Sequence, residues 1–280
     1  MKNAMQLKAI IKNLAQEHHI SAQLVMQNFM LERLLERISV STYRQNFILK
    51  GGFLIAAMVG IDTRATMDMD ATIKGFDLSH ESLQSIFDEV CGITVDDSIA
   101  FSVLRITDIR EGDIYPGLRV HLTANYPPLA VPLVVDITTG DKITPREIEY
   151  AYRLMFDDRS ISVMAYNLET IFAEKLETVL SRNIANTRPR DFYDIYILNA
   201  LRGAECDLPT LKQALAETTS RRGSEYVLGQ YREIMNNIQN SKQMLGFWEK
   251  YRKEYKYAKD ISFEDTCNSV MMIMNGVYGE

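Results

Sequence analysis

One stretch, residues 50–70, constrains what this chain can fold into more than any other. It reads KGGFLIAAMVGIDTRATMDMD and follows an apolar run. Its glycine pair, Gly51 and Gly52, has no Cβ atoms, so the backbone there can approach a ligand closely. The apolar residues after the pair predict a short helix, and the unpaired N–H groups at the start of a helix suit a phosphate. The stretch therefore predicts a phosphate-binding turn between a strand and a helix, and Gly60 is expected to end that helix in a left-handed cap.

The same stretch ends in two carboxylates. Asp68 and Asp70 are two residues apart on a predicted strand, so both side chains are expected on one face. Neighbouring carboxylates repel each other unless a divalent cation neutralises them, and hard oxygen ligands suit Mg²⁺ or Mn²⁺. Each pattern alone is common, a glycine pair in turns and Asp-x-Asp at exposed strand ends. Together they indicate phosphoryl or nucleotidyl transfer.

A third carboxylate, Asp136, is embedded in the apolar run of residues 134–138. Burying a carboxylate is costly unless something pairs with it. One interpretation places Asp136 in the same metal site. The alternative is an aspartate at a strand end that caps the next turn.

At this point the residues resemble a known family. A glycine pair followed by Arg-x-Thr-x-Asp-x-Asp is similar to the first motif of the nucleotidyltransferase superfamily, and more closely to that of the AbiEii/AbiGii toxins. These toxins belong to type IV toxin–antitoxin and abortive-infection systems. One residue departs from the superfamily pattern, because Phe53 stands where many members carry Ser or Thr. Phosphate binding would then depend on backbone amides and on Lys50.

The resemblance implies roles for particular residues. It implies a metal site at Asp68, Asp70 and Asp136, and catalytic roles for these three. It implies nucleotide binding by residues of the first motif and of two later ones, namely Lys50, Gly51, Gly52, Arg64, Thr66, Lys175 and Asp194. The implied cofactor is Mg²⁺ or Mn²⁺, and the implied substrate is a nucleoside triphosphate.

The two later motifs lie in a region of helical periodicity that begins after Asn167, a predicted cap. Lys175 resembles the family's lysine, which would offset charge on the leaving pyrophosphate. An alternative is a lysine that snorkels from an apolar face. Asp191 and Asp194 are three apart on one helical face and resemble the motif Arg-Asp-x-x-Asp. They would orient Lys175, bind the nucleotide sugar or act as a base, with Asp191 catalytic. Alone, they are typical helix N-terminal acids.

The remaining segments predict a conventional order of elements. Residues 7–37 are expected to form two helices, the second capped by Ser21, and Ser79 is expected to cap another. Strands are predicted over 101–109, 118–126 and 129–138, followed by a hairpin over 152–164. Breaks between the later helices are expected at the positions Pro209, Gly223, Gly246 and Asp260. Gly112 and the Pro116–Gly117 pair are predicted to punctuate the first strand connection.

Composition excludes several classes of protein. The 280 residues are 46% hydrophobic and 24% charged, which is ordinary for a globular protein. Three scattered cysteines form no disulfide framework, and no apolar run is long enough to span a bilayer or to act as a signal core. A cytoplasmic protein without a membrane partner is therefore expected. The net charge of −6 requires any nucleic-acid binding to use a local patch.

Such a patch is predicted near the C-terminus, where lysines and arginines alternate with Trp248 and tyrosines over residues 242–259. Interleaved basic and aromatic residues can hold an RNA backbone and stack on its bases. An amphipathic helix with a solvated basic face is the alternative.

We therefore predict an α+β protein. A nucleotidyltransferase-fold mixed sheet with flanking helices is expected over residues 1–165, followed by a helical domain over 166–280 that contributes the lysine and aspartate motifs to a cleft. The resemblance implies a toxin that moves a nucleotide from an NTP to an acceptor, an RNA such as tRNA, and so inhibits growth in phage defence. It also implies a separately encoded antitoxin. The alternatives are transfer to a protein or small molecule, and a non-catalytic nucleotide-binding module.

Overall fold

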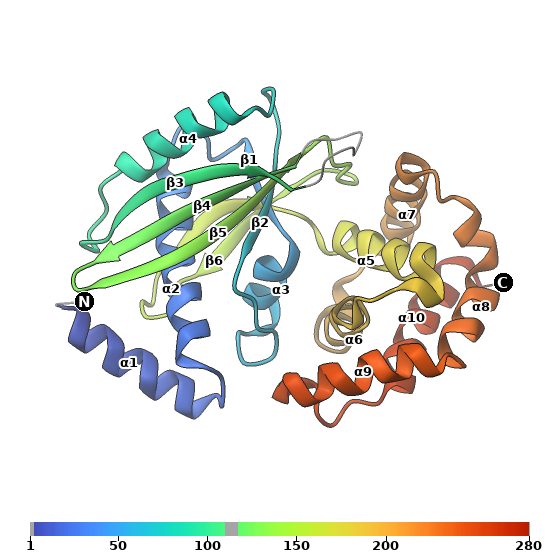
Figure 1. Ribbon diagram of the computed structural model, residues 1–280. Coiled ribbons are helices and arrows are strands. Elements are labelled where there is room, and N and C mark those ends of the chain that lie inside the picture. Colours follow the sequence, from blue (N-terminus) through green and yellow to red (C-terminus); the bar gives the residue numbers. More distant parts are fainter. Residues whose placement is uncertain (1–2, 110–116, 280) are drawn as a thin grey trace. The chain divides into compact units, whose positions relative to one another are not determined.

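The computed structural model describes residues 3–109 and 117–279 (Figure 1). The chain divides into two compact units. The first, Met1–Asp141 with Ile148–Ala165, is called the sheet unit here. The second, Lys142–Glu147 with Tyr166–Glu280, is called the helical unit. The linking segment joins the helical unit because the Asn167 side chain donates hydrogen bonds to the carbonyls of Thr144 and Arg146.

A mixed seven-stranded sheet forms the centre of the sheet unit, with strand order β3-β4-β5-β2-β1-β7-β6. The pairs β2–β5 and β1–β7 are parallel, and the remaining neighbours are antiparallel. This confirms the predicted α+β class with a mixed sheet. The strands are β1 (Phe47–Lys50), β2 (Met69–Ile73), β3 (Ala100–Asp108), β4 (Gly117–Tyr126), β5 (Leu129–Thr139), β6 (Ile148–Arg153) and β7 (Ser160–Ala165).

Four helices accompany this sheet. They are α1 (Ala4–Glu17), α2 (Ala22–Val40), α3 (Gly51–Val59) and α4 (His80–Gly92). Helix α2 packs against β5 and β7, and α4 runs along β3 (Figure 1). The predicted caps are confirmed, since Ser21 and Ser79 accept hydrogen bonds from the backbone N–H groups of Leu24 and Ser82. The apolar side chains of α2 and α4 form the core with one face of the sheet.

Sequence and structure agree on most strand limits. The three predicted strands correspond to β3, β4 and β5 within one residue at each end. The hairpin begins earlier than predicted, at Ile148, because Ile148 and Glu149 already pair with Ala165 and Met164 of β7. Gly112 and Pro116 lie outside the described residues. Gly60 does end α3 with a positive φ of 99°, but its ψ of 143° is not that of a left-handed helical cap.

Helix α2 carries charged side chains into the interior. Glu32, Arg33, Glu36 and Arg37 are all buried, and each has an opposite charge beside it. Arg37 donates to both carboxylate oxygens of Asp97 at 2.8 Å. Across the parts of the chain that the structure describes, no helix has the length and apolarity needed to cross a membrane.

The helical unit contains six α-helices in its described residues: α5 (Leu168–Arg182), α6 (Pro189–Arg202), α7 (Leu208–Arg222), α8 (Tyr226–Gln239), α9 (Lys242–Glu254) and α10 (Phe263–Tyr278). Asn167 caps α5 as predicted, and Gly223 ends α7 in the left-handed conformation. The predicted break at Gly246 is wrong. Helix α9 continues through it because Met244, Trp248 and Tyr251 share one buried stripe on both sides of the glycine.

Candidate functional site

The glycine turn lies where strand β1 passes directly into helix α3. Gly51 has a φ of +65°, a conformation that favours glycine. A Cβ at this position would lie 2.2 Å from Oδ2 of Asp70. The sequence predicted that this glycine makes room for a ligand. In the structure, it also makes room for one of the two carboxylates of its own motif.

Four charged residues lie side by side across four adjacent strands, and we call them the charge row. Lys50 on β1 is the cross-strand partner of Asp70 on β2. Asp70 is the partner of Asp136 on β5, and Asp136 is the partner of Arg119 on β4. Direct partners project from the same face of a sheet, with Cβ atoms about 5 Å apart. The row therefore places two carboxylates between two cations on the face opposite the buried residues of β4 and β5.

Asp68 lies beside this row but not on a strand. Strand β2 begins at Met69, so the prediction that Asp68 is a strand residue is wrong by one position. Its place is set by Thr66, whose Oγ1 donates to Oδ1 of Asp68 at 2.8 Å. A tethered bend therefore holds this carboxylate where the sequence predicted a strand.

Arg119 is the member of the row that sequence reasoning missed as a site residue. Its Nε and Nη2 each donate to one oxygen of Asp136 at 2.7 Å. The pKa of Arg119 is raised mainly by these hydrogen bonds, and the charges of Asp68 and Asp70 add to the effect. All three carboxylates therefore act on one guanidinium group, and Arg119 is the partner that an aspartate inside an apolar strand requires.

A signal for Arg119 was present in the sequence. Strands β4 and β5 are joined by two residues, Pro127 and Pro128, and pairing starts at Tyr126 and Leu129. Arg119 is eight residues before the first proline, and Asp136 is eight residues after the second. Counting outward from the turn, which sets hairpin register, would have paired them.

Lys50 is engaged at the other end of the row. Its Nζ donates to Thr138 Oγ1 at 2.7 Å and pairs with Asp141. Thr138 in turn donates to Asp141 at 2.9 Å. The predicted phosphate-binding lysine therefore has its amino group at the end of β5, with its side chain 13% exposed.

Phe53, the departure from the superfamily pattern, does not enter the glycine turn. Its side chain is buried, and its ring stacks on that of Tyr152 with centroids 5.8 Å apart. A hydroxyl is nevertheless close to the turn, because Thr66 Oγ1 lies 3.1 Å from where a Cβ on Gly52 would be. Arg64 Nη2 lies 3.0 Å from the same point. The motif residues Arg64 and Thr66 thus pack against the second glycine.

The donor chemistry of this region fits a divalent cation, since the three carboxylates around Arg119 offer hard oxygen ligands. Asp70 and Asp136 are direct cross-strand partners. Within residues 3–109 and 117–279, however, no three His, Cys, Asp or Glu side chains are grouped closely enough to hold a metal ion as they stand. Both oxygens of Asp136 are turned to Arg119. A metal held by Asp68 and Asp70 would therefore compete with Arg119 for the oxygens of Asp136.

In the helical unit, Lys175 on α5 meets both aspartates of α6, and we call these three residues the ion triad. Its Nζ lies 2.7 Å from Oδ1 of Asp191 and 2.8 Å from Oδ2 of Asp194. The side chains are 14%, 1% and 0% exposed, respectively. Lys175 is therefore held between carboxylates and does not simply snorkel to the surface.

One oxygen of the triad keeps its accepting capacity. Asp191 Oδ2 lies 3.1 Å from Arg188 Nε, but the two groups are not aligned for a hydrogen bond, and neither atom has another hydrogen-bond partner. A buried carboxylate oxygen with this geometry can accept a hydrogen bond from a hydroxyl group.

The aromatic residues near the C-terminus fall into two groups. Trp248 and Tyr251 are buried, which corrects the prediction that they are available to stack on bases. Tyr255 and Tyr257 are half-buried, and the ring of Tyr257 lies 4.8 Å from that of Tyr193 on α6. Four exposed lysines flank these two tyrosines: Lys250, Lys253, Lys256 and Lys259.

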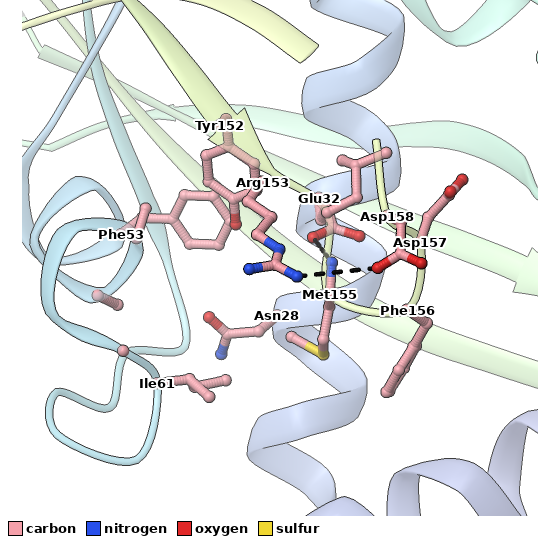
Figure 2. A pocket seen from close by; sticks show the side chains of 14 residues that line it. Asn28, Glu32, Phe53, Ile61, Tyr152, Arg153, Met155, Phe156, Asp157 and Asp158 are labelled. Carbon is pink, nitrogen blue, oxygen red and sulfur yellow. Dashed lines mark hydrogen bonds and ion pairs between the residues drawn. The ribbon is translucent and has the colours of Figure 1, made fainter. Parts of the chain in front are cut away.

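A separate cavity of about 420 Å³ lies in the sheet unit between α2, α3 and the β6–β7 turn (Figure 2). Glu32 lines it, and burial raises the pKa of this carboxyl to about 7 even though Arg33 and the Met155 N–H donate to it. Phe53 and Tyr152 form the facing wall (Figure 2). None of the four charge-row residues lines this cavity.

Comparison with known proteins identifies the family of this chain and structures with a similar fold. The family model "Nucleotidyl transferase AbiEii toxin, Type IV TA system" matches residues 33–268. A Helicobacter pylori protein described as a "putative nucleotidyltransferase" is similar in structure, with a TM-score of 0.52 and 12% identity over 92% of this chain and 96% of that chain. JHP933, also from Helicobacter pylori, has a TM-score of 0.50 and 12% identity over 92% and 93% of the two chains. A search of curated sequences gave no match. The family match covers most of the chain, and the protein therefore belongs to the AbiEii family of nucleotidyltransferase toxins of type IV toxin–antitoxin systems.

Proposed function

We propose that this toxin transfers a nucleotide from a nucleoside triphosphate to a hydroxyl group, with pyrophosphate as the leaving group. The observation that carries the proposal is the pairing of Asp70 with Asp136 on neighbouring strands, with Asp68 close by and the glycine turn of α3 against Asp70. Paired carboxylates next to the start of a helix, where the first N–H groups have no partner within the helix, suit a metal-bound phosphate.

Each predicted site residue has a proposed role in this reaction. Asp68, Asp70 and Asp136 would hold Mg²⁺ or Mn²⁺, which neutralises phosphate oxygens and polarises the phosphorus that is attacked. The amides of Gly51 and Gly52, with Lys50, Arg64 and Thr66, bind the phosphates. Lys175 offsets charge on the departing pyrophosphate.

The two aspartates of the ion triad have separate tasks. Asp194 has no exposed surface and fixes the position of the Lys175 amino group. Asp191 shares that task through Oδ1 and is the residue that we assign as the base for the incoming hydroxyl.

RNA is the acceptor we propose, with the end of a tRNA as one example. Tyr255 and Tyr257 are half-buried beside four exposed lysines, and Tyr257 packs on Tyr193, which directly precedes Asp194 of the triad. Stacking rings flanked by cations suit single-stranded RNA. The biological role proposed is growth inhibition in phage defence, in the cytoplasm and under the control of a separately encoded antitoxin.

The test is incubation with each of the four α-labelled nucleoside triphosphates, Mg²⁺ and total RNA. We expect label on an RNA band from one or more triphosphates, and a roughly 100- to 1000-fold loss with Asp70→Asn. Asp158→Asn, in a fully exposed hairpin turn, is the matched control and keeps the activity. Label on protein or on a small molecule would replace the RNA acceptor. Triphosphate binding without any label would favour a non-catalytic module and contradict the proposal.

A further inference from the structure

We propose that Arg119 is a positioning residue that competes with the metal ion for Asp136 and thereby limits metal binding. The inference rests on the proposed function, because it assumes that the carboxylates bind a divalent cation. Arg119 is not among the residues of this chain that resemble the family's motifs.

The contact between Arg119 and Asp136 has a defined geometry. Arg119 uses two nitrogens to bind the two oxygens of Asp136, both at 2.7 Å. A two-point contact of this kind fixes the orientation of a carboxylate. Asp136 is therefore preorganised for a guanidinium group, while its cross-strand partner Asp70 is not part of that contact.

The positive charge of Arg119 interacts with all three carboxylates. The charges of Asp68 and Asp70 act on Arg119 together with that of Asp136. A divalent ion among these carboxylates would lie close to a permanent positive charge, because arginine stays protonated at any ordinary pH. Arg119 and the metal ion thus neutralise the same negative charges and repel each other. Either one stabilises the carboxylates, and both together do so less well.

The partial exposure of Arg119 allows Asp136 to exchange this partner for a metal ion. The Arg119 side chain is 41% exposed and that of Asp136 is 15% exposed. Water can solvate the guanidinium of Arg119 once it leaves Asp136, so this exchange does not leave the guanidinium charge buried without a partner. Arg119 can therefore turn away when a metal ion arrives, and its pairing with Asp136 sets the metal concentration at which this happens.

The experiment measures binding of Mn²⁺ by electron paramagnetic resonance, without nucleotide or RNA. We expect Arg119→Gln to bind Mn²⁺ about tenfold more tightly than the parent, which is the effect of one positive charge about 6 Å from a divalent ion at a dielectric constant close to that of water. Arg119→Lys keeps the charge but loses the two-point contact, and it is expected to lie between the two. Arg105→Gln removes the same charge from an exposed position on β3 and is expected to leave the affinity unchanged.

Two further variants decide the origin of any change. Asp136→Asn in the Arg119→Gln background should cancel the gain, since the gain comes from freeing Asp136. Equal or weaker Mn²⁺ binding by Arg119→Gln would overturn the inference and make Arg119 an ordinary orienting group. If Asp70→Asn binds Mn²⁺ as the parent does, no metal site exists at these carboxylates, and the proposed function fails together with the inference.

Discussion

The sheet unit and the helical unit each hold a cation between or beside aspartates, but in opposite environments. Arg119 and Asp136 are 41% and 15% exposed, whereas the ion triad is 14%, 1% and 0% exposed. Removal of Lys175 leaves two carboxylates with almost no access to water, whereas Asp136 keeps part of its surface in water when Arg119 leaves. The comparison teaches that the ion triad is a fixed part of the structure, while the charge row is able to exchange partners.

The largest effect is expected from removing the cation of the ion triad. Lys175→Met leaves Asp191 and Asp194 without their common partner, and we expect a loss of about 3–5 kcal/mol in the free energy of unfolding. Urea denaturation measures it. Lys253→Met, at an exposed position on α9, is the matched control. A loss below about 1 kcal/mol would place the triad in the same class as a surface ion pair and contradict the difference between the ion triad and the charge row.

A buried carboxylate in the sheet unit tests whether burial, and not the unit, decides the cost of a charge. Burial raises the pKa of Glu32 from 4.5 to about 7. Between these values the unfolded chain is ionised at this residue while the folded protein keeps the proton. The stability from this group is therefore complete below pH 4.5 and is lost as the pH rises through 7.

The size of that loss is about 3 kcal/mol, since each pKa unit corresponds to about 1.4 kcal/mol. Chemical denaturation from pH 4 to pH 8 would show it as the difference between the parent and Glu32→Gln. Glu17→Gln, exposed on α1, controls for the loss of one carboxylate. A difference that does not change with pH would show that Glu32 is ionised throughout.

An intermediate effect is expected at the glycine turn. Gly51→Ala introduces a Cβ against the Asp70 carboxylate at a φ of +65°, and we expect a cost of about 1–3 kcal/mol. Gly229→Ala is the control, because it lies within α8 with nothing within 4 Å of an added Cβ, and it should stabilise by about 0.5–1 kcal/mol. Thermal unfolding of both variants measures the contrast. Equal stability of the two would show that Asp70 moves without cost.

The smallest effect is expected from Arg119→Gln, at about 0–1 kcal/mol, because its ion pair is half-exposed. The measurement is urea denaturation in the absence of metal, next to Lys175→Met. A cost as large as that of Lys175→Met would contradict the view that the two cations differ in kind.

The fold was largely predictable because its signals are local. The caps Ser21, Ser79 and Asn167 and the alternating strand β4 are encoded within a few residues of where they act. The failures involve distant partners. Gly246 was assigned to a break because its own preference was weighed without the buried stripe of α9. For the same reason the sequence left open whether Trp248 and Tyr251 stack on RNA, since composition does not show which face of a helix is covered.

The candidate site shows the same difference between local signals and distant partners. Its aspartates could be found by pattern, whereas the partners of Lys50 and Asp136 depend on sheet order and on register across several strands. The raised pKa of Glu32 could not be predicted at all, because burial in the folded protein causes it and the sequence does not show which distant segments cover this carboxyl.

The two-residue turn at Pro127 and Pro128 has a consequence for how this toxin can change over evolution. Most surface loops tolerate insertions, because lengthening them alters little beyond the loop. A single residue inserted here would shift the register of β4 against β5 and turn Arg119 to the opposite face of the sheet. We therefore expect lineages that keep an arginine opposite Asp136 to keep this connection at constant length. The length of the β4–β5 loop in related sequences would then indicate whether the arginine faces the proposed metal site.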